Sequence, residues 1–195
     1  MRVRFLAVLV AVLVAVTVGS AASAALLQHV PLQWRPTSQL QLGTMQMSQA
    51  PIQFEAFKDV RADKETIGEN REGDKPKPVT TTDDVGMFVG THMRELFDRA
   101  GLKTVDSDGA VIVRGEVTQF FVRETGTYKS EVAVRLTVVG RDGSTLWHGL
   151  ASGEATRFGR SYKLENYYEV LSDAIVNTVS SMLQSEEFQK ALLGH

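Results

Sequence analysis

The amino-acid sequence predicts an α+β domain in which an antiparallel or mixed β-sheet packs against two amphipathic helices. Apolar and polar residues alternate in three consecutive runs within residues 110–158, which is typical of strands with one buried face. Residues 83–100 and 164–184 instead repeat apolar residues every three or four positions, as amphipathic helices do. A sheet with one apolar face needs a cover, and the two helices supply it.

The three runs within residues 110–158 are expected to form a C-terminal three-strand meander. Residues of one parity are Val111, Val113, Val117 and Phe121 in the first strand and Val132, Val134, Leu136 and Val138 in the second. The joints, Glu-Thr-Gly-Thr at 124–127 and Arg-Asp-Gly-Ser at 141–144, carry glycine where a tight hairpin turn needs a positive φ.

Both expected helices carry termination signals. Thr80–Asp84 supplies side chains that accept hydrogen bonds from the first helical N–H groups, and Gly101 is a natural stop. In the second helix, residues 185–187 mark a break before a short terminal helical piece.

The N-terminus resembles a secretory signal peptide. Two arginines precede an apolar run from Phe5 to Val18, and Ala22–Ala24 has the A-x-A form of a cleavage site. Residues 1–24 are therefore expected to be removed before Ala25, with an uncleaved inner-membrane anchor as the alternative. The mature chain is expected to be exported, most simply to a bacterial periplasm, where it would be soluble or membrane-associated.

The chain between leader and first helix divides into two parts. Residues 25–50 are rich in Gln, Ser and Thr and are predicted to be either a flexible tether or an edge strand. Residues 51–195 are predicted to form a single domain. Within it, a strand is expected from Ile52 to Arg61, a surface loop over residues 69–82 because of its Lys-Pro pairs and Gly73, and a short strand at 103–105.

Composition excludes several kinds of chemistry. The chain has no cysteine, which rules out disulfides, thiolate nucleophiles and an acylated N-terminal cysteine. Its formal charge of −2 gives no general electrostatic reason to bind nucleic acid or an anionic membrane surface. No nucleotide-binding loop, zinc-protease motif, nucleophile elbow or calcium loop occurs. The sequence thus predicts no catalytic residue, no cofactor and no metal.

Histidines offer little more. His92 has Leu96, not a second ligand, one helical turn later, so a surface or half-buried histidine is expected. His148 falls in the third strand of the meander, where a cross-strand hydrogen bond is expected.

Two clusters are candidates for an interaction or a structural role. In an extended chain Asp59, Arg61 and Asp63 share one side, which predicts either an anion- or metal-binding corner or a salt-bridged strand end. Aromatic residues gather between the last strand and the last helix and either line a groove or seal the sheet–helix interface. They are Tyr128, Trp147, Phe158, Tyr162, Tyr167 and Tyr168.

The order of short motifs resembles the YajG-like family of bacterial envelope lipoproteins. The matching segments are VPLQW at 30–34, FKDVR at 57–61, IG at 67–68, LFDRAG at 96–101, VIVRGEVTQF at 111–120 and YEVLSDAI at 168–175. The resemblance implies a small periplasm-facing α+β domain, normally tethered to the outer membrane by an acylated cysteine. This chain has no such cysteine, so that lipid tether is absent.

Together these observations predict a non-catalytic envelope domain that binds a partner, a protein first and a lipid second. The partner would dock at an exposed edge of the meander or beside the last helix. An accessory protein for envelope lipid or lipopolysaccharide transport and assembly is the alternative, and it requires an unfilled apolar pocket. A hydrolase would require His92 or His148 to lie within reach of a serine and an aspartate. The sequence leaves homo-oligomerisation open.

Overall fold

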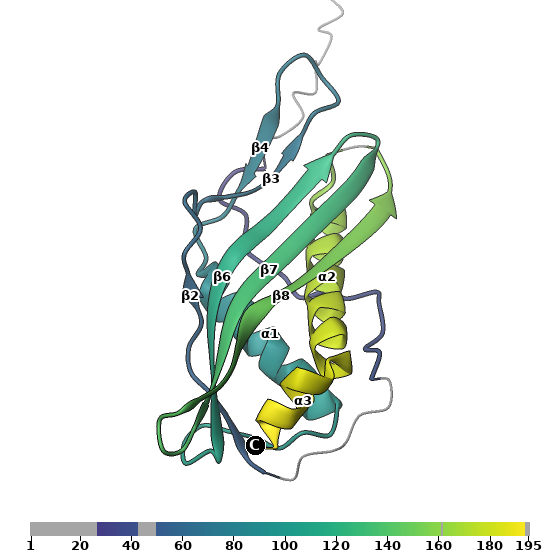
Figure 1. The fold of residues 1–195 in the computed structure, drawn as a ribbon. Helices are drawn as coiled ribbons and strands as arrows, with labels where there is room; N and C mark the ends of the chain where they lie inside the picture. Colours follow the sequence, from purple (N-terminus) through teal and green to yellow (C-terminus); the bar gives the residue numbers. More distant parts are fainter. Residues whose placement is uncertain (1–26, 43–49, 161, 194–195) are drawn as a thin grey trace, which may run out of the picture.

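The computed structural model describes residues 27–42, 50–160 and 162–193. Over these residues it forms one mixed eight-stranded sheet, with helices packed against one face of the long meander (Figure 1). The elements are β1 (Ile52–Phe54), β2 (Lys58–Asp59), β3 (Thr66–Asn70), β4 (Lys77–Thr80), α1 (Val85–Arg99), β5 (Thr104–Val105), β6 (Val111–Glu124), β7 (Thr127–Gly140), β8 (Thr145–Phe158), α2 (Leu164–Gln184) and α3 (Glu186–Leu192).

Strand β6 is the central strand of the sheet. One of its edges pairs with β7 along almost its whole length. The other edge is taken successively by β1, β2 and β3, all parallel to β6. Strand β5 extends the sheet beyond β1, and β4 extends it beyond β3. The predicted α+β class and the antiparallel meander β6–β7–β8 are confirmed.

The predicted helices and turns are confirmed almost to the residue. Asp84 caps α1 by accepting a 2.9 Å hydrogen bond from the N–H of Met87, and Ser185 caps α3 in the same way. The two meander turns place Gly126 and Gly143 at φ values of 83° and 86°, which a side chain with a Cβ adopts only at a cost.

One buried residue of β6 is mispredicted because the strand contains a bulge. The β6–β7 register shifts between Val117 and Gln119, so the extra residue Thr118 reverses which side chains face the helices. Phe120 and Val122 are therefore buried in place of Phe121, which is only half-buried.

The predicted surface loop over residues 69–82 holds only for the exposed residues 71–76. Strands β3 and β4 form an antiparallel hairpin there, separated by a short turn. Pro78 lies within β4, which pairs with β3 alone, and an edge strand tolerates a residue without an N–H. The single strand predicted from Ile52 to Arg61 is also interrupted, since β1 and β2 meet β6 at separate positions.

Residues 27–42, here called the N-terminal strap, contain no strand and lie along the helices. Val30 is buried, and Trp34 stacks on His92 of α1 with ring centroids 4.2 Å apart. The strap thus forms part of the packed structure. Residues 1–26 and 43–49, which hold the expected leader and the rest of the 25–50 segment apart from Ala50, lie outside the described residues.

A single hydrophobic core fills the space between the sheet and the helices. The largest fully buried side chains are Tyr128, Tyr167, Phe97, Phe120, Phe188, Ile52, Ile67, Met93, Leu136, Leu171, Ile175 and Leu183. Among the described residues, no helix has the length and apolar character needed to cross a membrane.

Candidate functional site

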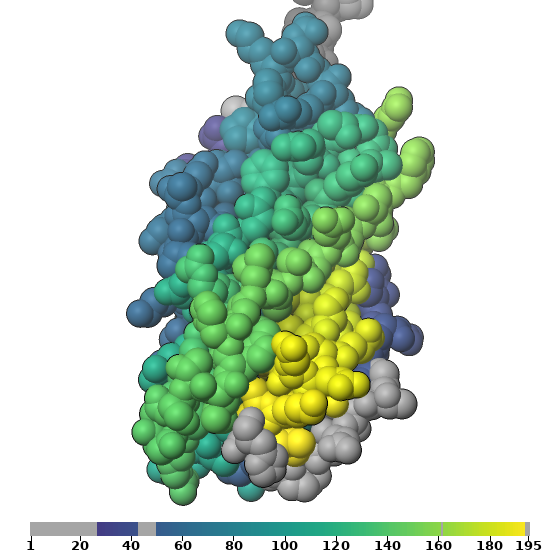
Figure 2. Space-filling view, in the orientation of Figure 1, coloured from purple at the N-terminus to yellow at the C-terminus, as the bar shows by residue number. Residues whose placement is uncertain are grey.

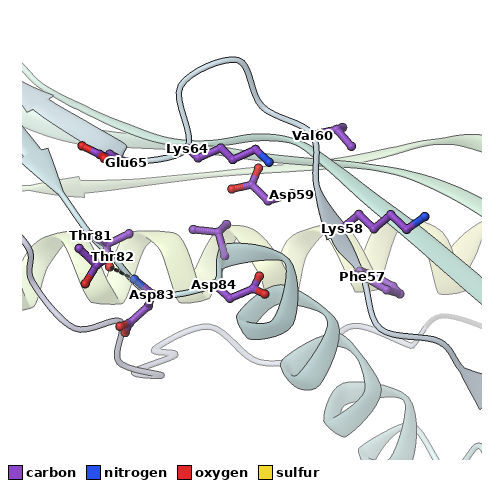
Figure 3. A pocket seen from close by; sticks show the side chains of 11 residues that line it. Phe57, Lys58, Asp59, Val60, Lys64, Glu65, Thr81, Thr82, Asp83 and Asp84 are labelled. Carbon is purple, nitrogen blue, oxygen red and sulfur yellow. Dashed lines mark hydrogen bonds between the residues drawn. The ribbon is translucent and has the colours of Figure 1, made fainter.

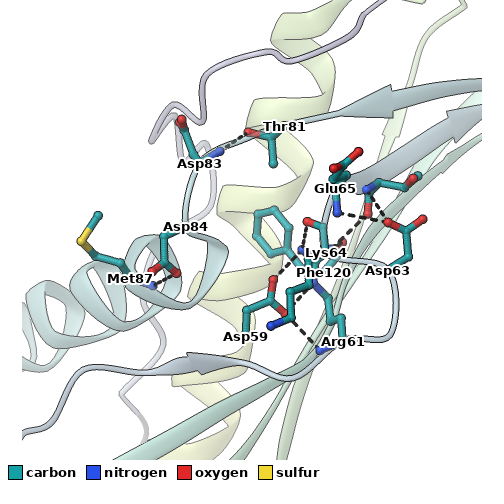
Figure 4. Close-up of polar contacts among 11 residues, drawn as sticks. Asp59, Arg61, Asp63, Lys64, Glu65, Thr81, Asp83, Asp84, Met87 and Phe120 are labelled. Carbon is teal, nitrogen blue, oxygen red and sulfur yellow. Dashed lines mark hydrogen bonds and ion pairs between the residues drawn. The ribbon is translucent and has the colours of Figure 1, made fainter.

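The Asp59–Arg61 corner is a closed hydrogen-bond network (Figure 4). Arg61 is 8% exposed and meets the Asp59 carboxylate through two bonds, Nε to Oδ1 at 3.0 Å and Nη2 to Oδ2 at 2.8 Å. Its remaining donors reach the backbone carbonyls of Thr66, Phe120 and Lys64 at 3.0, 3.2 and 2.7 Å. The guanidinium therefore fastens the 60–66 loop to β6 and uses its donors within the protein.

Asp63, the third residue of this predicted cluster, caps backbone N–H groups of the following turn and does not pair with Arg61. Its carboxylate accepts hydrogen bonds from the backbone N–H groups of Glu65 and Thr66, at 3.1 and 3.0 Å. Hydrogen bonds from Thr66, first from its side chain and then from its backbone, hold the pKa of Asp63 below its ordinary value. Of the two carboxylates, Asp59 is thus the one that pairs directly with Arg61.

A hollow of about 670 Å³ opens beside this corner, between β2, the 60–65 loop and the start of α1 (Figure 3). Lys58 and Lys64 line it together with Asp59, Asp83 and Asp84. Its aspartates already accept hydrogen bonds: Asp83 from the Leu32 N–H at 2.8 Å, Asp84 from Met87, and Asp59 from Arg61. The described residues contain no group of three or more acidic or histidine side chains placed to hold a metal ion.

Neither His92 nor His148 is assembled into a nucleophile–base pair. Nδ1 of His92 lies 2.9 Å from Oε2 of Glu95, and its ring is stacked on Trp34. Nδ1 of His148 lies 3.2 Å from Oγ1 of Thr137 on the neighbouring strand, the cross-strand contact that the sequence predicted. The serine and aspartate that the hydrolase hypothesis requires are not among these hydrogen-bond partners.

Four of the predicted aromatic residues converge at the start of α2. Tyr128 and Tyr167 are fully buried with their rings perpendicular, 5.2 Å between centroids. The hydroxyl of Tyr162 donates to the Pro78 carbonyl at 2.8 Å, and Tyr168 is buried with the Arg35 guanidinium 5.8 Å from its ring centre. Trp147 stands apart, packed edge-on against Phe188 of α3.

A buried carboxylate that sequence reasoning missed joins these tyrosines. Glu124 is fully buried at the end of β6, where Oε2 accepts the Tyr167 hydroxyl and Oε1 accepts the Tyr162 N–H, both at 2.9 Å. Burial first, and Glu124 next, raises the pKa of Tyr167. In the sequence, Glu124 was the only hint: beyond the bulge of β6 it falls on the same side of the strand as the buried residues Phe120 and Val122. These contacts close the sheet–helix interface.

Helix α2 holds the N-terminal strap through polar residues that sequence reasoning also missed. Asp173 accepts two backbone N–H bonds, from Thr37 at 2.6 Å and Ser38 at 2.7 Å, and the Thr37 hydroxyl at 2.6 Å. Ser172 and Ser180 accept the N–H groups of strap residues Arg35 and Gln41, at 2.9 and 3.1 Å. All three α2 side chains are buried. Polar residues facing the strap therefore pair with its backbone.

The open edge of the meander adjoins an apolar groove. Strand β8 pairs with β7 alone among the described strands. Beside it, a groove of about 250 Å³ runs between β8 and the α2–α3 junction, lined mainly by Trp147, Leu150, Met182 and Phe188. Leu150 is 65% exposed on the middle of β8. This combination of unpaired backbone and exposed apolar surface makes the β8 edge the strongest docking candidate.

No family model matches the sequence. No curated protein matches it either. Among solved structures, the fold is similar to protein XCC0632 from Xanthomonas campestris, described by the family model DUF330, at a TM-score of 0.58 and 8% identity over 80% of this chain and 94% of that one.

Two more distant structures are a PelC dodecamer from Paraburkholderia phytofirmans (TM-score 0.42, 12% identity, 73% of this chain and 97% of that one) and lipoprotein GNA1162 from Neisseria meningitidis (TM-score 0.37, 14% identity, 68% and 99%). The likeness to XCC0632 supports the fold assignment, and the other two are too distant to add to it.

Proposed function

We propose that this chain is a non-catalytic domain of the bacterial cell envelope that binds a polypeptide partner along β8. The observation that carries the proposal is the edge itself: β8 is 14 residues long and pairs on one side only within the described sheet. A long unpaired edge is a template for an added strand, whose main-chain hydrogen bonds supply affinity.

The direction of the β8 backbone groups fits this role. The side-chain amide of Asn177 donates to the Glu154 carbonyl at 2.8 Å, so that carbonyl points toward α2 and away from β7. Because backbone groups alternate in an antiparallel ladder, those of Leu150 and Ser152 also point away from β7. An incoming strand would find its donors and acceptors at these positions.

The adjoining groove would give the interaction its side-chain preference. An added strand alternates its side chains between two faces, and those on the helix side would meet Trp147, Leu150 and Phe188. The groove lies below the usual size of a small-molecule pocket, roughly 300–1,000 Å³, and suits an apolar side chain. The preferred partner segment is therefore extended and carries at least one large apolar residue.

The envelope address rests on the expected leader and on the order of motifs that resembles the YajG-like family. The likeness to XCC0632 supports the α+β fold of that expectation. The lipid-accessory alternative has less support, because the interior between sheet and helices is occupied by large buried side chains. A periplasm-facing accessory that binds protein is the better fit.

Site-specific photocrosslinking in producing cells tests this function. A photoreactive phenylalanine analogue replaces Leu150 in the full chain, and the control places it at Met87 of α1, which is 62% exposed. A discrete adduct at position 150, absent at position 87, is expected. Adding Ser152→Pro removes an outward N–H and should abolish the adduct. Equal adducts at both positions, none at position 150, or an adduct unaffected by proline contradicts the proposal.

A further inference from the structure

We infer that one end of the sheet is built to rest on the headgroups of an anionic lipid bilayer. This hairpin end consists of the β3–β4 hairpin (residues 66–80), the β6–β7 turn (125–126) and residues 156–160 and 162–163 at and after the close of β8. It lies at the upper end of the molecule in Figures 1 and 2. The inference shares with the proposed function only the expectation of export, and it does not depend on the middle of β8.

The strand register brings these segments to one level. Lys77 pairs with Asn70, Asn70 with Glu124, Glu124 with Tyr128, and Tyr128 with Arg157. This row crosses β4, β3, β6, β7 and β8, so charged residues far apart in the sequence share one edge of the sheet. Gly159 and Lys163 lie beside it, because the Tyr128 ring is close to Gly159 and its hydroxyl accepts the Lys163 N–H at 3.2 Å.

The charges of this end do not cancel. Its arginines pair with acids: Arg71 and Arg123 with Glu69, Arg160 with Glu72, and Arg157 with Glu169. Three exposed lysines of this end form no ion pair among the described residues, namely Lys75, Lys77 and Lys163. Against them stands one exposed acid of this end without an ion pair among the described residues, Asp74. The whole-chain charge of −2 conceals this local excess of cations.

An exposed aromatic side chain accompanies the lysines. Phe158, the last residue of β8, is 84% exposed, the most exposed of the large hydrophobic side chains in the described chain. It pairs with Thr127 beside the β6–β7 turn. A large exposed apolar ring on an end that also carries exposed lysines matches a bilayer interface, where the ring enters the headgroup layer and the ammonium groups meet lipid phosphates.

The path of the chain places the same end next to the expected leader. The Leu27 N–H donates to the Tyr162 hydroxyl at 3.1 Å, and the Leu27 carbonyl accepts the Thr80 N–H at 2.9 Å. Three residue steps separate Leu27 from Ala24, the last residue of the expected leader, a reach of at most about 11 Å. A retained leader would therefore join the domain at its hairpin end.

The absence of cysteine allows a direct test with one fluorophore per molecule. An environment-sensitive dye is attached to the full chain at Thr125→Cys, in the hairpin end, or at Ser107→Cys, before the opposite end of β6; both positions are exposed. The two dyes are separated by 14 residues of β6, roughly 45 Å. Phosphatidylglycerol-containing vesicles are expected to blue-shift the dye at 125 and leave the dye at 107 unchanged, with little response to pure phosphatidylcholine.

Charge reversal then identifies the cations. The triple variant Lys75→Glu, Lys77→Glu, Lys163→Glu should bind the anionic vesicles at least roughly 100-fold more weakly, since each lysine near such a surface contributes about a fivefold factor. The matched control, Lys103→Glu with Lys190→Glu, alters exposed lysines outside the hairpin end and should bind as the parent does.

Three results would overturn the inference: no response at position 125, an equal response at position 107, or a triple variant that binds like the parent. The vesicles contain lipid only, so these outcomes leave the β8 crosslinking result standing. A partner that binds at β8 without any vesicle response would separate the two proposals.

Discussion

Replacing Asp173 by alanine is expected to release the N-terminal strap from α2. The Asp173 carboxylate is 8% exposed and accepts three hydrogen bonds from Thr37 and Ser38, all between 2.6 and 2.7 Å. Alanine removes the acceptor and leaves three donors facing a short side chain. Because no other residue of α2 bonds these two strap residues in the described chain, the local attachment depends on Asp173.

The expected loss of unfolding free energy depends on the number of hydrogen bonds removed, and it is limited by how tightly the strap docks. Hydrogen bonds to a charged group contribute about 1.5–3 kcal/mol each, so three would give up to about 9 kcal/mol if the strap stayed in place. It need not stay, because a detached strap regains water as a hydrogen-bond partner. The loss therefore cannot exceed the free energy with which the strap docks, and about 2–4 kcal/mol is expected for Asp173→Ala.

Two measurements check this prediction. Urea denaturation gives the change in unfolding free energy, and amide hydrogen exchange at residues 35–41 reports whether the strap has detached. Ser181→Ala is the matched control, since Ser181 is an exposed α2 residue, and it should change stability by less than about 0.5 kcal/mol. If Asp173→Ala were as mild as Ser181→Ala, or if strap amides exchanged at the parent rate, the strap would not be held as described.

Two further predictions concern the sheet–helix interface. Gly153→Ala should destabilise the fold by about 3 kcal/mol, because a Cβ there would lie 2.4 Å from both the Ala174 carbonyl oxygen and the Thr178 nitrogen. Gly73→Ala is the control, since a Cβ at Gly73 meets open space and should leave stability unchanged. Equal denaturation midpoints for the two variants would contradict the reasoning. The pKa of Tyr167 is raised above the ordinary 10.0 by burial and then by Glu124, so the folded state holds this proton more tightly than the unfolded state. That stabilisation is present below about pH 10 and is lost as the pH rises above it; denaturation from pH 8 to 11 should show the decline, and Tyr167→Phe should make it shallower.

The parts of the fold that could be predicted are those whose signals are local in the sequence. Alternation, Asp-Gly chemistry and helical periodicity each act within a few residues, and they placed the meander and the helices correctly. The cross-strand contact of His148 followed from the same local pattern. The Asp59–Arg61 pair followed as well, because the two residues are neighbours on one side of an extended chain.

The mispredicted parts depend on partners far away in the sequence. Thr118 forms a bulge because the β6–β7 pairing shifts register there, and the residues next to Thr118 in the sequence carry no signal of that shift. Pro78 looked like a loop residue, although it is a strand residue at a sheet edge that needs no donor. Strand β3 exists because the end of β6 offers a free edge about 50 residues later in the chain.

The N-terminal strap was hidden for the same reason. The strap residues show no alternation of apolar and polar side chains. The site that binds the strap lies on α2, where Ser172, Asp173 and Ser180 are polar but buried. A buried polar residue on a helix requires a partner, and here the partners are strap N–H groups more than 130 residues away. Polar residues on an otherwise apolar helix surface are thus the sequence signal for such a strap.

The strap also connects the two proposals. Leu27, the first residue of the strap, is held at the hairpin end by its hydrogen bonds to Tyr162 and Thr80. Strand β8 ends at Phe158 in the hairpin end and begins at Thr145 near the opposite end. With the hairpin end on a bilayer, the open β8 edge would rise away from the lipid, and a partner strand added to it would extend from the membrane surface toward the far end of the domain.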